Sequence, residues 1–141
     1  MDLTDADASW RPVAPLARPR VGHAAAALRG SVYISGGHSG DGIPILTAER
    51  FDGETETWCG SPPPSVPRMF STMAAIGNSI YVLGGILSVV PGSPALQSAE
   101  RLDAARGHWQ PAPAMLEGRH DFCAVAVKTG RLALPEPAAE G

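Results

Sequence analysis

Short runs of β-branched and aromatic residues alternate along this chain with glycine-rich turns. Two of these runs, 32–34 and 80–83, end just before the only Gly-Gly pairs of the chain, at 36–37 and 84–85. Apolar runs of this length and composition, bounded by glycine, are typical of β-strands. The pattern therefore predicts two strands that each stop at a glycine pair.

A run of mostly small residues precedes each of these strands, at 24–28 and at 72–76. The turns between the runs are Arg29-Gly30-Ser31 and Gly77-Asn78-Ser79, whose residue types favour tight turns. Each small-residue run therefore predicts a first strand that pairs with the run after it, and small side chains suit a strand packed tightly near an axis.

Two further strands are expected in each unit. The third carries Arg50-Phe51-Asp52 or Arg101-Leu102-Asp103, and the fourth begins at a tryptophan and runs into proline-rich turns. Residues 95–106 have good helix propensity on their own. Their counterpart, 47–58, reads less like a helix, so the repeat favours a strand here as well.

The same residue types recur at matching offsets. The three tryptophans are spaced 48 and 51 residues apart, and an arginine follows each by ten residues. Tyrosines precede both glycine pairs by three residues, and a glutamate precedes the second and third tryptophans by nine. These recurring residues, with a structural role expected for each, are Trp10, Tyr33, Gly36, Gly37, Glu49, Trp58, Tyr81, Gly84, Gly85, Glu100 and Trp109.

Four short strands in a unit of about 50 residues are typical of a propeller blade. We therefore predict an all-β fold, a propeller fragment with two near-complete four-stranded blades and partial flanking blades. The units differ in length only between the glycine pair and the glutamate, which are 12 residues apart in one unit and 15 in the other. Repeat architectures confine such insertions to loops on one face, often the binding face.

The repeat divides the chain into five segments. Residues 1–19 are expected to hold the third and fourth strands of a preceding blade, because Leu3 stands where Phe51 and Leu102 stand. A truncated blade is expected at 118–134, with a first strand over 122–127, and Pro135-Glu136 stands where a glycine pair is expected. The segments are 1–19, a blade at 20–66, a blade at 67–117, the truncated blade at 118–134, and a disordered tail at 135–141.

A closed propeller needs about four to eight blades. An open stack exposes unpaired strand edges and apolar blade faces. The chain is therefore expected to be a fragment, a truncated isoform or a partial gene product, or to be completed by another chain.

Composition narrows the class of protein. With 16 glycines and 14 prolines in 141 residues the chain cannot be a helical bundle, while 44% hydrophobic residues are enough for a core. A net charge of −3 gives no basic footprint for nucleic acid, and no apolar run approaches a membrane span. The acidic start has no secretory signal, and two unpaired cysteines fit a reducing compartment. We expect a cytoplasmic protein, and these features do not exclude the nucleus as its location.

Candidate catalytic and metal-binding residues are sparse. Residues 37–42 are loosely glycine-rich but lack the Lys-Ser/Thr of a phosphate-binding loop. His38, Ser39 and Asp41 have the residue types of a hydrolytic triad, yet neighbours in one loop cannot form its geometry. The four histidines, His23, His38, His108 and His120, have no metal-ligand spacing. No cofactor, no metal and no enzymatic activity are expected.

The order of arginine, Gly-Gly, Glu-Arg-hydrophobic-Asp and tryptophan resembles the kelch repeat. Ile-Tyr-Val-Leu-Gly-Gly at 80–85 and Ala-Glu-Arg-Leu-Asp at 99–103 are most similar to the kelch-like proteins, which pair a BTB domain with a kelch propeller. The resemblance covers residues 2 to about 132. It implies a recognition propeller that grips a peptide segment of a client protein with the loops between its second and third strands and between its fourth and first strands.

Carried onto this chain, these loops supply the candidate partner-binding residues. The turn arginines recur in each unit, which favours a structural role in which they connect one blade to the next. They also lie beside the recognition loops. The apolar loop residues suggest a client with apolar anchors. The candidates are Arg20, Val21, His38, Ser39, Asp41, Arg68, Met69, Phe70, Ile86, Leu87, Arg119, His120 and Asp121.

The resemblance implies part of a substrate-recognition adaptor for a cullin-type ubiquitin ligase, although the BTB domain that engages the cullin is not in this sequence. Two alternatives remain: an actin-binding or cytoskeletal kelch scaffold, and a truncated isoform without function. Some kelch propellers host catalysis, which would need converging histidine, tyrosine and cysteine ligands or paired acids. The strand periodicity already accounts for Tyr33 and Tyr81, so an enzyme is disfavoured.

Overall fold

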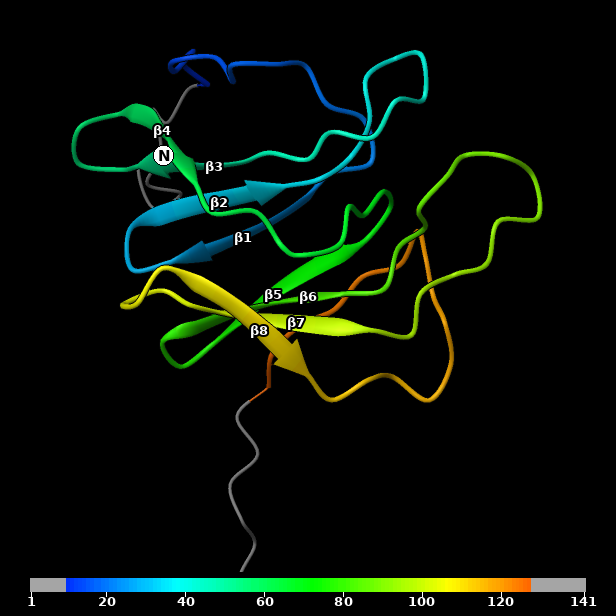
Figure 1. The fold of residues 1–141 in the computed structure, drawn as a ribbon. Helices are drawn as coiled ribbons and strands as arrows, with labels where there is room; N and C mark the ends of the chain where they lie inside the picture. The colour runs from blue at the N-terminus through cyan, green and yellow to red at the C-terminus, as the bar shows by residue number, and fades with distance from the viewer. Residues whose placement is uncertain (1–9, 128–141) are drawn as a thin grey trace, which may run out of the picture.

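The computed structural model describes residues 10–127, in which eight five-residue strands form two antiparallel sheets (Figure 1). Each sheet follows chain order, β1-β2-β3-β4 in the first and β5-β6-β7-β8 in the second. No helix occurs in the described residues, so the all-β prediction is confirmed. The strands are β1 (Ala24–Leu28), β2 (Ser31–Ser35), β3 (Ala48–Asp52), β4 (Thr57–Ser61), β5 (Thr72–Ile76), β6 (Ser79–Leu83), β7 (Ala99–Asp103) and β8 (His108–Ala112).

The segment with helix propensity, 95–106, is a loop followed by β7. The two sheets share one register: Phe51 pairs with Trp58 in the first, and Leu102 with Trp109 in the second. The repeat register therefore predicted this strand where propensity alone would have failed, because ladder pairing and packing outweigh a weak intrinsic preference.

The same type of turn joins the third and fourth strands of each sheet. The Oδ1 atom of Asp52 accepts hydrogen bonds from the amides of Glu54 and Thr55 at 3.0 and 3.2 Å. Asp103 Oδ1 accepts the equivalent pair of hydrogen bonds from the amides of Ala105 and Arg106, also at 3.0 and 3.2 Å. A short carboxylate that bonds the backbone two and three residues ahead stabilises a tight turn. This explains the aspartate at the end of the repeated Glu-Arg-hydrophobic-Asp motif.

The core lies between the two sheets, which are stacked as layers (Figure 1). Ala24 of β1 is buried against Met73, Ile80, Val82 and Leu102 of the second sheet. The small side chain of Ala24 allows β1 to approach β5 closely, as expected for a first strand near an axis. Apolar burial of this kind contributes about 25 cal/mol per Å² and is the main attraction between the blades.

The connections differ at the two ends of the stack. Tight turns join β1 to β2 and β5 to β6 at one end, while the long β2–β3 and β6–β7 loops project together at the other (Figure 1). Both long loops follow glycine pairs, and they hold the length difference between the units.

Two predicted flanking strands do not form in the described residues. Residues 10–20 contain no strand, although a fourth strand was expected at Trp10, and 122–127 contain none, although a first strand was expected there. A strand needs a hydrogen-bonded neighbour, and the neighbours predicted for both, in 1–9 and 128–134, lie outside the described residues, as does the tail at 135–141. The amide of Ala124 makes one bond to Thr72 Oγ1, at 3.3 Å.

None of the described residues belongs to a helix long and apolar enough to cross a membrane.

Candidate recognition site

The turn that begins each blade is hydrogen-bonded to the long loop of the same blade. The amide of Val21 donates to the carbonyl of His38, and the amide of His38 donates to the carbonyl of Val21, each at 2.9 Å. Met69 and Ile86 exchange the same pair of bonds at 3.0 and 2.9 Å. The residue after the turn arginine therefore lies beside the residue after the glycine pair in both blades, which joins the two kinds of predicted recognition loop.

The next residue of each turn has left-handed backbone geometry. These residues are Gly22, Phe70 and Asp121, with φ of 63°, 55° and 55°. They are linked in series, because the amide of Phe70 donates to Gly22 at 2.7 Å and the amide of Asp121 donates to Phe70 at 2.8 Å. Glycine adopts this conformation without steric cost, whereas phenylalanine does not. The series of backbone bonds keeps a bulky aromatic residue in a strained conformation at the loop end of the stack.

The glycine pairs allow neighbouring blades to approach. The amide of Gly37 donates to Arg68 O at 2.9 Å, and that of Gly85 donates to Arg119 O at 2.8 Å. A Cβ on Gly36 would lie 2.2 Å from Arg68 O, and one on Gly84 would lie 2.3 Å from Arg119 O. No other residue type fits these positions without moving the backbone.

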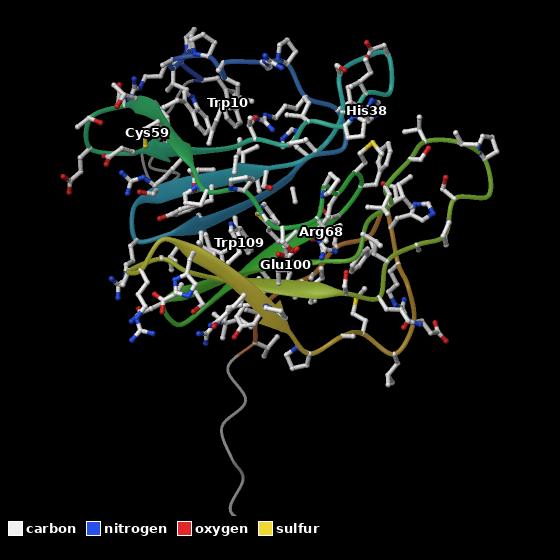
Figure 2. The ribbon with its side chains drawn as sticks, viewed as in Figure 1. Trp10, His38, Cys59, Arg68, Glu100 and Trp109 are labelled. Atoms are coloured by element: carbon white, nitrogen blue, oxygen red, sulfur yellow. The ribbon has the colours of Figure 1, made fainter. Side chains whose placement is uncertain are left out.

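Two of the recurring arginines form buried ion pairs with the recurring glutamates. Arg20 Nη2 lies 2.7 Å from Glu49 Oε1, and Arg68 Nη2 lies 3.0 Å from Glu100 Oε1. Figure 2 shows Arg68 and Glu100 close together at the loop end of the second sheet. The guanidinium of Arg68 also donates to the carbonyls of Gly84 and Ser98, at 2.8 and 3.0 Å. Each arginine thus holds the two ends of its blade's long loop together.

The glutamates also receive backbone bonds from the proline-rich segments. The amide of Ala17 donates to Glu49 at 3.0 Å, and that of Ser65 donates to Glu100 at 2.8 Å. Burial alone would raise the pKa of both carboxyls, but these amides and the paired arginines outweigh it, so each pKa lies below its ordinary value. Both glutamates are therefore ionised at neutral pH.

The loops of both blades enclose one concavity of about 570 Å³, which we call the loop pocket. The β2–β3 loop, the β4–β5 connection, the β6–β7 loop and the segment after β8 contribute to it. Six of the predicted loop residues meet here, from positions as far apart as 38 and 121. The lining residues are His38, Gly40, Asp41, Gly42, Phe70, Ile86, Val89, His120 and Asp121.

The aromatic ring of Phe70 packs inside this framework. Its centroid lies 5.6 Å from that of His38, and the two rings are tilted by 50°. A Cβ on Gly22 would lie 2.8 Å from the Phe70 ring, so the absence of a side chain at Gly22 makes room for it. The position of the pocket's aromatic residue therefore depends on a glycine of the neighbouring blade.

Asp41 is the acidic residue of the first blade in the pocket. Its carboxylate accepts hydrogen bonds from Ser39 Oγ and from the amide of Ile43, the latter at 3.2 Å. These bonds, with a smaller contribution from the charge of His38, hold the pKa of Asp41 below its ordinary value. The carboxylate is charged at neutral pH, and no lysine or arginine is among the residues that line the pocket.

His38, Ser39 and Asp41 do not form a catalytic relay. The Nδ1 atom of His38 lies 2.5 Å from the Ser39 carbonyl, not from its hydroxyl, and that hydroxyl bonds Asp41. In residues 10–127 no three histidine, cysteine, aspartate or glutamate side chains gather as metal ligands would.

Several candidate recognition residues lie away from solvent. Arg20 and Arg68 are buried in the ion pairs, and Met69 is fully buried in contact with the loop it bonds. Placing these three residues in a client-binding surface is therefore wrong. The geometry of the two arginines agrees with the structural role that their recurrence favours. Sequence alone could not separate Met69 from Phe70, because burial depends on the neighbouring blade.

The remaining candidates surround the pocket or support it. Val21 and Leu87 are about half exposed outside the lining, and Ser39 bonds Asp41. Arg119 is exposed and lies 3.5 Å from Glu117.

Gly40, Gly42 and Val89 also line the pocket; they lie in the predicted loops that follow the Gly-Gly pairs but were not among the named candidates. A Cβ on Gly42 would lie 2.8 Å from Val89 Cγ2, so the two long loops meet at this point. The signal was present, because Val89 and Val90 form an apolar pair in the longer of the two loops. An apolar pair in a loop that is otherwise expected to be polar indicates a contact or binding role.

The tryptophans show how the blades are fastened to the segments before them. Trp58 Nε1 donates to Ala14 O, and Trp109 Nε1 donates to Pro62 O, both at 2.8 Å. Trp58 also packs on Phe51, with ring centroids 5.2 Å apart. The expected packing role fails for Trp10, which is 90% exposed (Figure 2). The position equivalent to Phe51 is Leu3, outside the described residues.

Stacked four-stranded antiparallel sheets, with a shared register and long loops at one end, are typical of the blades of a β-propeller repeat protein. The Kelch motif family model matches residues 19–65 and 67–116, more than half of the chain. This protein belongs to the kelch repeat family.

Curated relatives extend the match. The chain is 38% identical over 77 residues to an F-box/kelch-repeat protein of Arabidopsis thaliana, covering 55% of this chain and 20% of that protein. It is 36% identical over 96 residues to Kelch-like protein 36 of Bos taurus, covering 67% and 15%. Against Kelch-like protein 25 of Xenopus tropicalis it is 28% identical over 122 residues, covering 83% and 21%. The chain thus spans about a fifth or less of these relatives.

Proposed function

We propose that the loop pocket binds a peptide segment of a partner protein. The observation that carries this proposal is the convergence of six predicted loop residues from both blades on one concavity of about 570 Å³. Binding pockets of this size combine apolar walls with a few polar groups that orient the ligand. The loop pocket has both, with Phe70, Ile86 and Val89 as apolar members.

Phe70 is the residue we expect to contribute most to binding. Aromatic residues that are held rigidly and surrounded by apolar neighbours dominate the energetics of protein interfaces. The backbone bonds on both sides of Phe70 and its packing against Gly22 and His38 hold the ring in place before a ligand arrives. Little conformational entropy is then lost on binding.

The test of this site is photocrosslinking in cells. A benzophenone amino acid replaces Leu87, an exposed residue beside the pocket, in the chain with Phe70 and in the F70A variant. The matched control places the same group at Glu54, an exposed residue in the turn between β3 and β4. We expect crosslinked partners from position 87 that are lost in F70A and absent at position 54. Partners unaffected by F70A would contradict the proposal.

We propose further that the partner is the client of a cytoplasmic substrate adaptor for a cullin-type ubiquitin ligase. One relative is an F-box/kelch-repeat protein, and this chain spans 20% or less of that protein and of two kelch-like relatives, which supports a parent protein that joins kelch repeats to other domains. This chain would then supply the client-binding part of that adaptor.

A competition experiment tests the adaptor role. Extra copies of the 141-residue chain, which carries the loop pocket, occupy the client without delivering it to the ligase. Ubiquitination of the crosslinked partner is therefore expected to fall with the native chain and to stay unchanged with F70A. Unchanged ubiquitination with both chains would contradict the adaptor role and leave the peptide-binding site standing.

A further inference from the structure

We propose that the loop pocket selects a segment in which an arginine adjoins an apolar side chain. This inference rests on the proposed function and specifies the chemistry of the ligand. It depends on three features of the pocket, which are its apolar wall, its two carboxylates and the absence of lysine and arginine among the described residues that line it.

The apolar wall is built around a strained residue. Phe70 has a φ of 55°, a strained conformation that bulky residues rarely adopt. The amide and the carbonyl of Phe70 are both hydrogen-bonded, to Gly22 and Asp121, and these bonds hold the strained conformation. Ile86 and Val89 continue the apolar lining. Strain that is maintained in this way is found at ligand-binding sites, and here it presents an aromatic ring to the pocket.

The two carboxylates come from different parts of the fold. Asp41 belongs to the long loop of the first blade, and Asp121 follows the last strand of the second. The hydrogen bonds to Asp41 within residues 10–127 end on Oδ1, which leaves Oδ2 for a ligand. Asp121 is exposed, and no ion pair engages it in the part of the chain that the structure describes. Both acids are thus available to a cation in the pocket.

The arginines close to these loops are engaged elsewhere. Arg20 and Arg68 are buried in their ion pairs with glutamates, and Arg119 lies against Glu117. None of the three lines the pocket. The charged groups facing the pocket are therefore two aspartates, accompanied by His38 and His120. Charge complementarity favours a cationic ligand and opposes an acidic one.

Arginine fits this combination better than lysine. Its planar guanidinium forms paired hydrogen bonds with a carboxylate and stacks on an aromatic face, whereas an ammonium acts as a point charge. An arginine between the carboxylates and the Phe70 ring would use both interactions. An apolar neighbour in the same segment would then contact Ile86 and Val89.

The test is selection of random 12-residue peptides, displayed on phage, against the 141-residue chain, with removal of those that also bind F70A. The expected sequences carry arginine beside an apolar residue. For a synthetic peptide of this kind, replacing arginine by glutamate is expected to weaken binding more than 10-fold. D41N and D121N are each expected to weaken it about 2- to 5-fold, and E54Q, which lies outside the pocket, to leave it unchanged. Added salt should reduce the effect of both aspartates.

The other outcomes separate the two levels of the proposal. Enriched peptides that depend on Phe70 but are acidic or have no charge preference would overturn the arginine inference and leave the peptide-binding site. Failure to enrich any peptide that depends on Phe70 would overturn both. Light scattering of the same samples examines a second occupant: a dimer that F70A dissociates would place another copy of this chain in the pocket and overturn the proposal.

Discussion

Arg68 Nη2 lies 3.0 Å from Glu100 Oε1 inside the second blade, as Arg20 Nη2 lies 2.7 Å from Glu49 Oε1 in the first. Both pairs are shielded from water, and both arginines reach the carbonyl of the first glycine in their own Gly-Gly pair. The same ion pair therefore holds the two ends of the long loop together in each blade. These two loops contribute residues to the loop pocket.

Removing one member of such a pair should strongly destabilise the fold. E100A leaves the guanidinium of Arg68 buried without its counter-charge, so we expect a loss of about 3–5 kcal/mol in the free energy of unfolding. Urea unfolding followed by circular dichroism measures this. The control is R106A, which removes an exposed arginine 3.9 Å from Asp103 and should cost less than about 1 kcal/mol. Equal losses in both variants would contradict the role of the buried pair.

Acid should destabilise this protein through the same glutamates. The pKa of Glu49 and that of Glu100 are lowered in the folded state, despite burial, by backbone amides and arginines. The unfolded chain therefore binds more protons in the titration range, and stability rises with pH there. The contribution is complete above the ordinary glutamate pKa and is lost as pH falls through the lowered folded values.

The measurement is the free energy of unfolding as a function of pH. In the E49Q/E100Q variant we expect lower stability at neutral pH and a shallower decline below about pH 5. Asp52 and Asp103 also have lowered pKa values, owing to turn amides, so part of the decline should persist. An unchanged slope in the double variant would show that the buried pairs do not set the acid response.

A side chain at Gly84 should displace the segment that follows the second sheet. The φ of this residue is 63°, and a Cβ would lie 2.3 Å from Arg119 O. G84A should therefore cost more than the 1–3 kcal/mol typical of backbone strain alone, seen as a lower urea midpoint. The matched control is G60A in β4, where a Cβ meets nothing within 4 Å. If G84A is as stable as G60A, the close approach at the glycine pair is wrong.

The tryptophans should differ sharply in their contributions. W109F removes the hydrogen bond from Nε1 to Pro62 O, so we expect a loss of about 1 kcal/mol in the free energy of unfolding. W10F should change stability by less than about 0.5 kcal/mol, because Trp10 is 90% exposed. Thermal melts of the two variants in parallel check both expectations, and a larger loss from W10F would contradict the packing described above.

The repeat made much of the fold predictable. Strand type, strand order and the position of the long loops follow from short-range signals, such as the glycine after Tyr33-Ile34-Ser35 and the aspartate that ends each third strand. These residues act on their own backbone, so their effect can be read from neighbouring positions. The strand expected at 122–127 marks the limit of this reasoning, because it is not formed within the described residues and its expected partner lies outside them.

The candidate site was predictable as a set of loops but not as a surface. Phe70, Ile86 and His120 were named from their positions after the turn arginines and the glycine pair, and they line the pocket. Met69, next to Phe70, was named on the same grounds and is fully buried. Val89 was missed, since the approach of its loop to Gly42 depends on how one blade sits on the next.

The sequence alone determined the all-β class, the two repeats, their register and the loops that vary between them, because periodic side chains and turn residues encode these features locally. Only the tertiary structure decided which loop residues face solvent and which arginines form ion pairs with buried glutamates. It also decided that side chains from both blades line one pocket. Those properties arise from contacts between residues 29 or more positions apart, and burial and charge compensation depend on what packing brings together in space.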